Sequence, residues 1–108
     1  MPGSDTPQAL VTRLFRELRN ETWPAHLNAA ERAGIDLVML DADIAGCVTT
    51  WLSNGGSLDA RRLRILRRNL SDLDQVLPGL DETDNVRLWQ LWQQIAQLIS
   101  ETAPHPTN

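Results

Sequence analysis

The chain has 108 residues, of which 42% are hydrophobic and 22% charged, and its formal net charge is −4. This length corresponds to one domain rather than several. The composition excludes a collagen-like chain and an intrinsically disordered one, because the apolar content is close to the globular average and the net charge is small. A chain of this size can bury one modest hydrophobic core.

The number of cysteines and the N-terminal residues favour a cytoplasmic location. A single cysteine, Cys47, excludes a disulfide within the chain and favours a reducing environment. The segment Met1–Pro7 has neither the basic nor the apolar stretch of a secretory signal. No apolar run reaches the roughly 18 residues that a membrane span needs. We therefore expect a cytoplasmic protein without a membrane segment.

The first predicted helix begins at Thr6-Pro7, because a threonine cap followed by proline is typical of helix N-termini. Its apolar residues share one face: Leu10, Val11, Leu14, Phe15 and Leu18. Trp23-Pro24 interrupts this helix. A short alanine-rich helix is predicted over residues 24–33, with Gly34 ending it.

The second long helix is predicted over about residues 36–53, with Asp36 as its cap and the turn Asn54-Gly55-Gly56 at its end. Its inner face carries the apolar residues Leu37, Leu40, Ile44, Val48, Trp51 and Leu52. A later start is the alternative, in which Asp41 is the cap and residues 35–40 are extended.

Two further helices complete the pattern. Ser57 is the predicted cap of a helix over residues 58–77, in which leucines recur three and four residues apart. That spacing is typical of a helix that packs lengthwise on another. The last helix is predicted to begin with Asp81 or Thr83 as its cap and to run to about Thr102.

These elements predict an all-α fold. We expect one helical domain over residues 1–108, built as a small antiparallel bundle of four main helices. The short helix after Trp23 is an additional fifth element. Loose ends are expected at about 1–5 and 103–108, where proline prevents the last helix from continuing.

Three polar residues fall within apolar helical faces. A projection at about 100° per residue places Asp41 among apolar neighbours, and Arg62 and Asn69 among the leucines of the next helix. An ionised carboxylate is costly there unless it is paired. We predict a buried polar pair between Asp41 and either Arg62 or Asn69. It would fix the helix register or mark a perturbed acid at a functional site.

Arginine supplies all ten basic residues, and five of these lie on the helix predicted over 58–77. Arg61, Arg64 and Arg68 lie on its outer face, with Arg67 to one side. Like charges at this spacing cost a few tenths of a kcal/mol per pair, and Asp72 is the one good local partner, for Arg68. The face is either solvated or a docking surface for an acidic protein or for phosphates.

An acidic segment follows the arginines directly. It contains Asp72, Asp74, Asp81, Glu82 and Asp84. These carboxylates would repel a nucleic acid that approached both segments, so a protein partner is favoured over nucleic acid.

Four tryptophans are many for this length: Trp23, Trp51, Trp89 and Trp92. We assign Trp51 and Trp92 to the core. Trp89 lies at the margin of the apolar face of the last helix, and a partly exposed tryptophan is a favoured interface anchor. Trp89 is therefore a predicted interface residue, with Trp23 second. The alternative is a half-buried bundle residue.

Catalytic and metal-binding patterns are missing from the sequence. The two histidines are far apart, and Cys47 is expected to face the core as a small hydrophobe. Glu17 and Glu21 are one turn apart, but no second acidic pair accompanies them as a helical magnesium enzyme would require. We therefore expect no enzymatic activity, no metal and no cofactor.

The expected function is a non-enzymatic protein-binding module with a charged, tryptophan-containing surface: Arg61, Arg64, Arg67, Arg68, Asp72 and Trp89. A bacterial inhibitor or immunity-type protein is the specific form that we expect, with the acidic segment imitating phosphates to a basic toxin. The alternatives are a homodimer or larger homo-oligomer formed through the leucines and Trp89, and a nucleic-acid-binding protein that uses the Arg61–Arg68 face.

Overall fold

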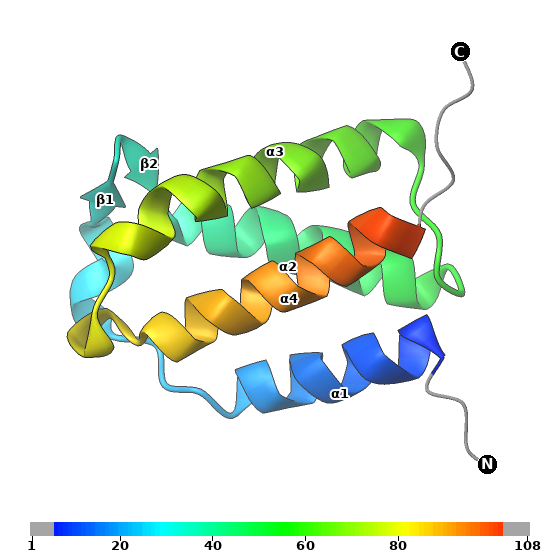
Figure 1. Cartoon of the computed structure of the whole chain (residues 1–108), viewed down its shortest axis with the longest axis horizontal. Helices are drawn as coiled ribbons and strands as arrows, with labels where there is room; N and C mark the ends of the chain where they lie inside the picture. The colour runs from blue at the N-terminus through cyan, green and yellow to red at the C-terminus, as the bar shows by residue number, and fades with distance from the viewer. Residues whose placement is uncertain (1–5, 103–108) are drawn as a thin grey trace.

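The computed structural model describes residues 6–102. Four helices form an antiparallel bundle in which α4 lies in front of α2 and between α3 and α1 (Figure 1). Their bounds are Pro7–Arg19 for α1, Leu37–Ser53 for α2, Ala60–Val76 for α3 and Val86–Thr102 for α4. The predicted all-α bundle is confirmed. The predicted loose ends, 1–5 and 103–108, lie outside the described residues.

Helices α1 and α2 begin where the sequence predicts. The Thr6 hydroxyl accepts a hydrogen bond from the Ala9 N–H at 3.1 Å. The Asp36 carboxylate accepts one from the Met39 N–H at 3.0 Å. Each cap satisfies a backbone donor that has no partner within the first helical turn. The alternative start of α2 at Asp41 is therefore wrong.

Helix α3 begins two residues later than the cap at Ser57 predicts. Asp59 is the cap instead, and its carboxylate accepts a hydrogen bond from the Arg62 N–H at 2.7 Å. A carboxylate at this position also interacts favourably with the helix dipole, which a serine hydroxyl does not match. The helix ends at Val76 and continues into a one-turn 3-10 helix, η2 (Leu77–Gly79).

The prediction of a helix over residues 24–33, between α1 and α2, is wrong. Only η1 (Ala25–Ala29) is helical, as a 3-10 turn, and it is followed by a two-stranded antiparallel hairpin. The strands are β1 (Glu31–Arg32) and β2 (Ile35–Asp36). Ala33 and Gly34 have φ values of 54° and 77°. Two consecutive left-handed residues form a tight hairpin turn and end the helical path.

The start of α4 is also later than predicted. Asp81 caps a single 3-10 turn, η3 (Glu82–Asp84), in a reciprocal capping box with Asp84. Asn85 follows in the left-handed conformation at φ 56°. This residue breaks the helical path, so α4 begins afresh at Val86.

The core is filled mainly by aliphatic side chains and three tryptophans: Trp51, Trp89 and Trp92. The core assignment of Trp51 and Trp92 is confirmed, as is that of Cys47. Leu27 from η1 is completely buried as well. The connection between α1 and α2 therefore packs as part of the domain and covers one end of the bundle.

Candidate functional site

Trp89 does not lie on the surface, so the prediction of a tryptophan interface anchor there is wrong. Its exposed fraction is 0%. The Trp23 ring packs against it with centroids 5.8 Å apart, and Trp23 is itself half-buried, with its Nε1 donating to Asn28 Oδ1. The irregular segment after α1 therefore covers the edge of α4 that carries Trp89. A helical projection of α4 alone predicts that this edge is exposed.

The predicted pair of Asp41 with Arg62 or Asn69 does not form. Asp41 is half-buried, as its position on α2 implies, but its Oδ1 accepts a hydrogen bond from Trp92 Nε1 at 2.8 Å. Burial raises the pKa of the Asp41 carboxyl above its ordinary value, and the bond from Trp92 opposes that shift. The partner comes from α4, because a tryptophan N–H there needs an acceptor inside the core.

Replacing Asp41 by asparagine is expected to leave the protein as stable or more stable at pH 7. The raised pKa means that the folded state prefers the protonated carboxyl, so ionisation costs stability as pH rises from the ordinary value of 3.8. Asparagine keeps the acceptor oxygen and carries no charge. Urea unfolding at pH 7 and at about pH 4 should show the advantage of the variant shrinking in acid. A clearly less stable variant at pH 7 would contradict this account.

The two candidate partners of Asp41 lie in different environments. Arg62 is exposed and forms an ion pair at 2.6 Å with Asp59, the N-cap residue of α3. Asn69 is buried as predicted, at 1% exposure, and its Nδ2 has no hydrogen-bond partner within the described residues. The Arg62 position falls on the apolar face in a helical projection, but its side chain is long. It therefore extends to solvent, and its charge is not buried.

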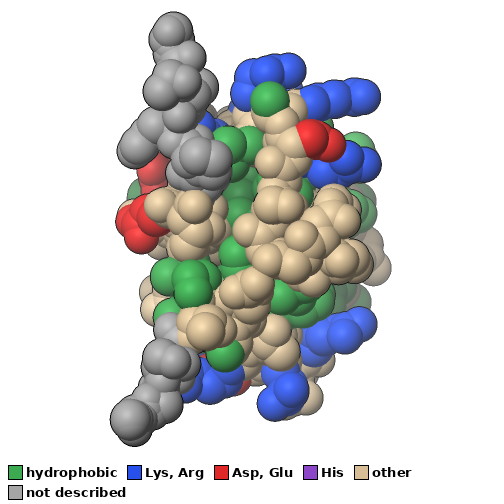
Figure 2. All heavy atoms as spheres, turned by 90° about the vertical axis from the view of Figure 1, so that its right-hand side faces the viewer, with side chains coloured by type: hydrophobic (Ala, Val, Ile, Leu, Met, Phe, Trp, Pro, Cys, Tyr) green, Lys and Arg blue, Asp and Glu red, His purple; other side chains and the backbone are tan. Residues whose placement is uncertain are grey.

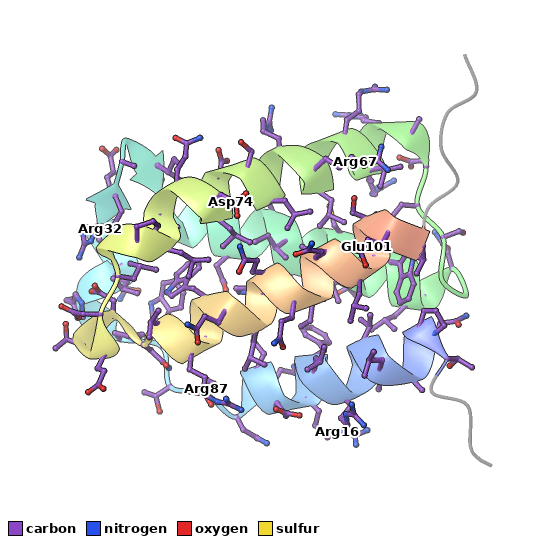
Figure 3. All side chains as sticks on the ribbon, viewed as in Figure 1. Arg16, Arg32, Arg67, Asp74, Arg87 and Glu101 are labelled. Carbon is purple, nitrogen blue, oxygen red and sulfur yellow. The ribbon has the colours of Figure 1, made fainter. Side chains whose placement is uncertain are left out.

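Arg67 is held within the fold. Its Nε donates to Ser100 Oγ at 3.1 Å, which links α3 to the C-terminal part of α4. Figure 3 shows Arg67 on α3 close to Glu101 at that end of α4. This arginine is therefore partly used for packing, unlike its neighbours on the outer face.

Arg61, Arg64 and Arg68 are exposed, and among the described residues none of them forms an ion pair. They surround the half-buried Ile65 and border a shallow hollow of about 510 Å³. In the end-on view of Figure 2, arginine side chains gather at the top right, above the end of the bundle where α3 begins. The structure thus brings three of the predicted partner-binding residues together on one face with an apolar side chain among them.

The charge order along α3 opposes its helix dipole. Arginines occupy its N-terminal half and Asp72 and Asp74 its C-terminal half. Cations stabilise a helix near its C-terminus and anions near its N-terminus, by about 0.3–1 kcal/mol each. Arg61 and Arg64 therefore lie at the end of the helix where a cation is unfavourable. Neither forms an ion pair within residues 6–102, although the positive charge of Arg61 adds to the hydrogen bonds from Arg62 in lowering the pKa of the Asp59 carboxyl.

The acidic residues that follow do not form one continuous strip. Asp72 is half-buried and makes no ion pair with Arg68 within the described part of the chain, so the predicted local pair is not formed. Asp74 accepts a hydrogen bond from Gln93 Nε2 on α4. Asp81 is occupied in capping η3.

Asp84 is the centre of a polar cluster that the sequence patterns did not indicate. Its side chain is 6% exposed, with Oδ1 lying 2.8 Å from His26 Nε2 and 3.3 Å from an Arg32 nitrogen. The hydrogen bond with His26, followed by the Asp81 N–H and Arg32, holds the pKa of Asp84 below its ordinary value. These residues join η1, β1 and η3, which only the folded hairpin brings together. Arg32 lies at this hairpin in Figure 3.

Replacing Asp84 by asparagine is expected to destabilise the fold by about 1–3 kcal/mol at pH 7, because it removes the negative charge and one of the two acceptor oxygens that serve His26, Arg32 and the Asp81 N–H. The lowered pKa means that the ionised form contributes stability above the ordinary value of 3.8, and that this contribution is lost as pH falls below it. Wild type and variant should therefore converge in acid. Chemical denaturation across this range tests the expectation, and a pH-independent difference would contradict it.

The acidic pair on α1 is used in packing. Arg87 of α4 lies 3.2 Å from Glu17 and 3.1 Å from Glu21, at the meeting of α1 and α4 visible in Figure 3. Two carboxylates that share one guanidinium link the two helices. Between residues 6 and 102, no three His, Cys, Asp or Glu side chains are grouped as metal ligands would be.

Within the described residues, no helix combines the length and apolar character that crossing a bilayer requires. Comparison with protein-family models, with curated proteins and with solved structures gives no match.

Proposed function

We propose that this chain is a non-enzymatic protein-binding module that binds an acidic surface of another protein through Arg61, Arg64 and Arg68. The observation that carries the proposal is that three exposed guanidinium groups surround Ile65 without an ion pair inside the described structure. Arginine is enriched among the residues that dominate binding energy, particularly where apolar surface adjoins it. The unfavourable position of these charges on α3 supports a role other than stability.

The narrower form of the proposal is a bacterial inhibitor or immunity-type protein that acts in the cytoplasm. The basic α3 face would meet an acidic region of the toxin. This differs from the basic toxin first expected, because Asp74, Asp81 and Asp84 of the acidic segment are engaged in contacts within the fold. The single cysteine supports a reducing setting. Co-expression with the captured partner provides a direct test. The wild-type chain should relieve the toxicity of that partner, and a variant with Arg61, Arg64 and Arg68 replaced by glutamine should not.

The test of the proposal is affinity capture from the source cells with the immobilised wild-type chain and with Arg61→Gln/Arg64→Gln/Arg68→Gln. We expect an acidic protein that the wild-type chain retains and the α3 variant loses. The matched control is Arg13→Gln/Arg16→Gln/Arg19→Gln, which makes the same net charge change on α1. Capture that is identical for all three chains would refute the proposal.

Nucleic-acid binding through the same arginines is the alternative that this experiment separates. Asp59 and Asp72 border the arginines on α3, which disfavours a continuous polyanion. Titration of labelled DNA and RNA at two salt concentrations should show no arginine-dependent binding at low salt. Tight, salt-dependent binding would favour the nucleic-acid function instead.

Self-association through the leucines and Trp89 is the remaining alternative. Leu66, Leu73 and Trp89 are completely buried within one chain, so the surface which that alternative requires is already used in the core. Sedimentation should show a monomer at micromolar concentration. A stable dimer would require a different contact surface from the one first predicted.

A further inference from the structure

A hollow that is open to solvent lies between α1 and α4, two helices that run side by side in Figure 1. Its volume is about 400 Å³. We call it the α1/α4 hollow. None of its lining residues belongs to α3, so it is separate from the arginine face. Three leucines and three polar residues line it: Leu10 and Leu14 from α1, and Gln94, Gln97, Leu98 and Glu101 from α4.

The three leucines of the α1/α4 hollow are only half-buried. On α1, Val11 and Leu18 fill the core, whereas Leu10 and Leu14 lie at the margin of the same apolar face. Leu98 lies at the facing margin of α4. Apolar surface that two helices gather into one hollow is shielded from water when a partner places an apolar side chain there.

The exposed side of α4 beside the hollow is uncharged. Between Arg87 and Glu101 the helix has no charged residue, and its exposed positions are Gln90, Gln94 and Gln97. The central parts of protein interfaces are depleted of charged residues. A glutamine amide both donates to and accepts from a partner's backbone. This side of α4 therefore fits an uncharged stretch of a protein better than a charged one.

Glu101 places a single carboxylate at one end of the hollow. It is exposed, and its Oε2 accepts a hydrogen bond from Gln97 Nε2 at 3.4 Å. Within residues 6–102 it forms no ion pair. Arg67, which lies close to it in Figure 3, donates to Ser100 instead. An anion in the last turn of a helix is unfavourable for the helix itself. This carboxylate is therefore available to a cation of a partner.

We propose that the α1/α4 hollow binds a protein segment that carries an apolar side chain and, within about four residues of it, a lysine or an arginine. The apolar side chain contacts the three leucines, the backbone beside it hydrogen-bonds to the glutamine amides, and the cation meets Glu101. The inference is independent of the α3 arginines, which fit a partner surface of the opposite charge.

Three other occupants fit this chemistry less well. Residues 1–5 and 103–108 of the chain contain no lysine or arginine, so neither segment supplies the cation from such a side chain. A nucleic acid would bring its phosphates to a hollow whose one charged group is a carboxylate. A second copy of the chain would make the protein dimerise, which sedimentation measures directly.

The test is a selection from a random library of peptides displayed on phage, each about 12 residues long and able to span the hollow in extended form. The bait is the full chain with Arg61→Gln/Arg64→Gln/Arg68→Gln, which removes the acidic ligands expected of α3. We expect the selected peptides to combine leucine, isoleucine, methionine or phenylalanine with a lysine or arginine within four residues. The tightest peptide is then titrated into the wild-type chain and its variants.

Four variants at exposed positions separate the two parts of the site. Glu101→Lys is expected to weaken binding about tenfold and to prefer the peptide in which glutamate replaces the cation. Glu31→Lys, the same charge change on β1, should bind like wild type. Gln94→Trp, which fills the hollow, should weaken binding at least tenfold. Gln90→Trp, one turn earlier on α4 and outside the hollow, should have no effect.

The inference is overturned if the selection yields no such sequences, if Glu101→Lys and Glu31→Lys bind the peptide equally, or if Gln94→Trp leaves binding unchanged. A dimer of the chain alone that Gln94→Trp dissociates would assign the hollow to a second copy and would also overturn it. None of these results concerns capture through the α3 arginines, so the proposed function would stand.

Discussion

Replacing Arg61, Arg64 and Arg68 together by glutamine is expected to stabilise the protein by about 0.5–1.5 kcal/mol while weakening capture of its partner about 100-fold. Stability rises because the change removes like-charge repulsion along α3 and cations from the positive end of its dipole. Binding falls because three guanidinium groups, each contributing about 1 kcal/mol, are lost from the contact. Urea unfolding and titration with the captured protein measure the two effects separately.

The matched change on α1 should have the opposite effect on stability. Arg16 and Arg19 lie in the last turn of α1, where cations favour the helix, and Arg19 stacks over the Phe15 ring at 5.1 Å. Replacing Arg13, Arg16 and Arg19 by glutamine should therefore lower stability and leave binding intact. If the α3 variant were the less stable of the two, the dipole argument for a functional surface would be wrong.

Replacing Trp89 by alanine is expected to lower the free energy of unfolding by about 3–5 kcal/mol, because the substitution leaves a cavity in the middle of the bundle. Trp89→Phe should cost much less, about 1–2 kcal/mol, since the indole Nε1 that it removes is buried without a partner in the described structure. Chemical denaturation of both variants provides the measurement. Partner binding by the folded Trp89→Phe protein should be unchanged, because Trp89 has no exposed surface.

Trp92→Phe is the natural comparison for Trp89→Phe. Trp92 is equally buried, but its Nε1 donates to Asp41, so phenylalanine would leave a half-buried carboxylate without that donor. We expect it to be the more destabilising of the two substitutions. Equal costs would show that the hydrogen bond to Asp41 contributes little to stability.

The candidate surface was predictable because its residues are consecutive on one helix. The three and four residue spacing of Arg61, Arg64 and Arg68 places them on one face whatever the rest of the chain does. Their lack of ion pairs within residues 6–102 was not predictable from spacing, because acidic side chains on neighbouring elements could have paired with them. Asp59 instead pairs with Arg62, and Glu17 and Glu21 pair with Arg87.

Local spacing, caps and apolar periodicity were sufficient to indicate four helices and most of the core, because these signals depend on residues within one or two turns of each other. The partners of Asp41 and Asp84 depended on contacts 51 and 58 residues apart in the chain, with Trp92 and His26. The hairpin after α1 and the covering of Trp89 by Trp23 likewise followed from packing, which a helical projection of a single segment does not contain. The residues on a helical face are set by local spacing, whereas the side chains that pack on each face are set by how the helices and loops fold together.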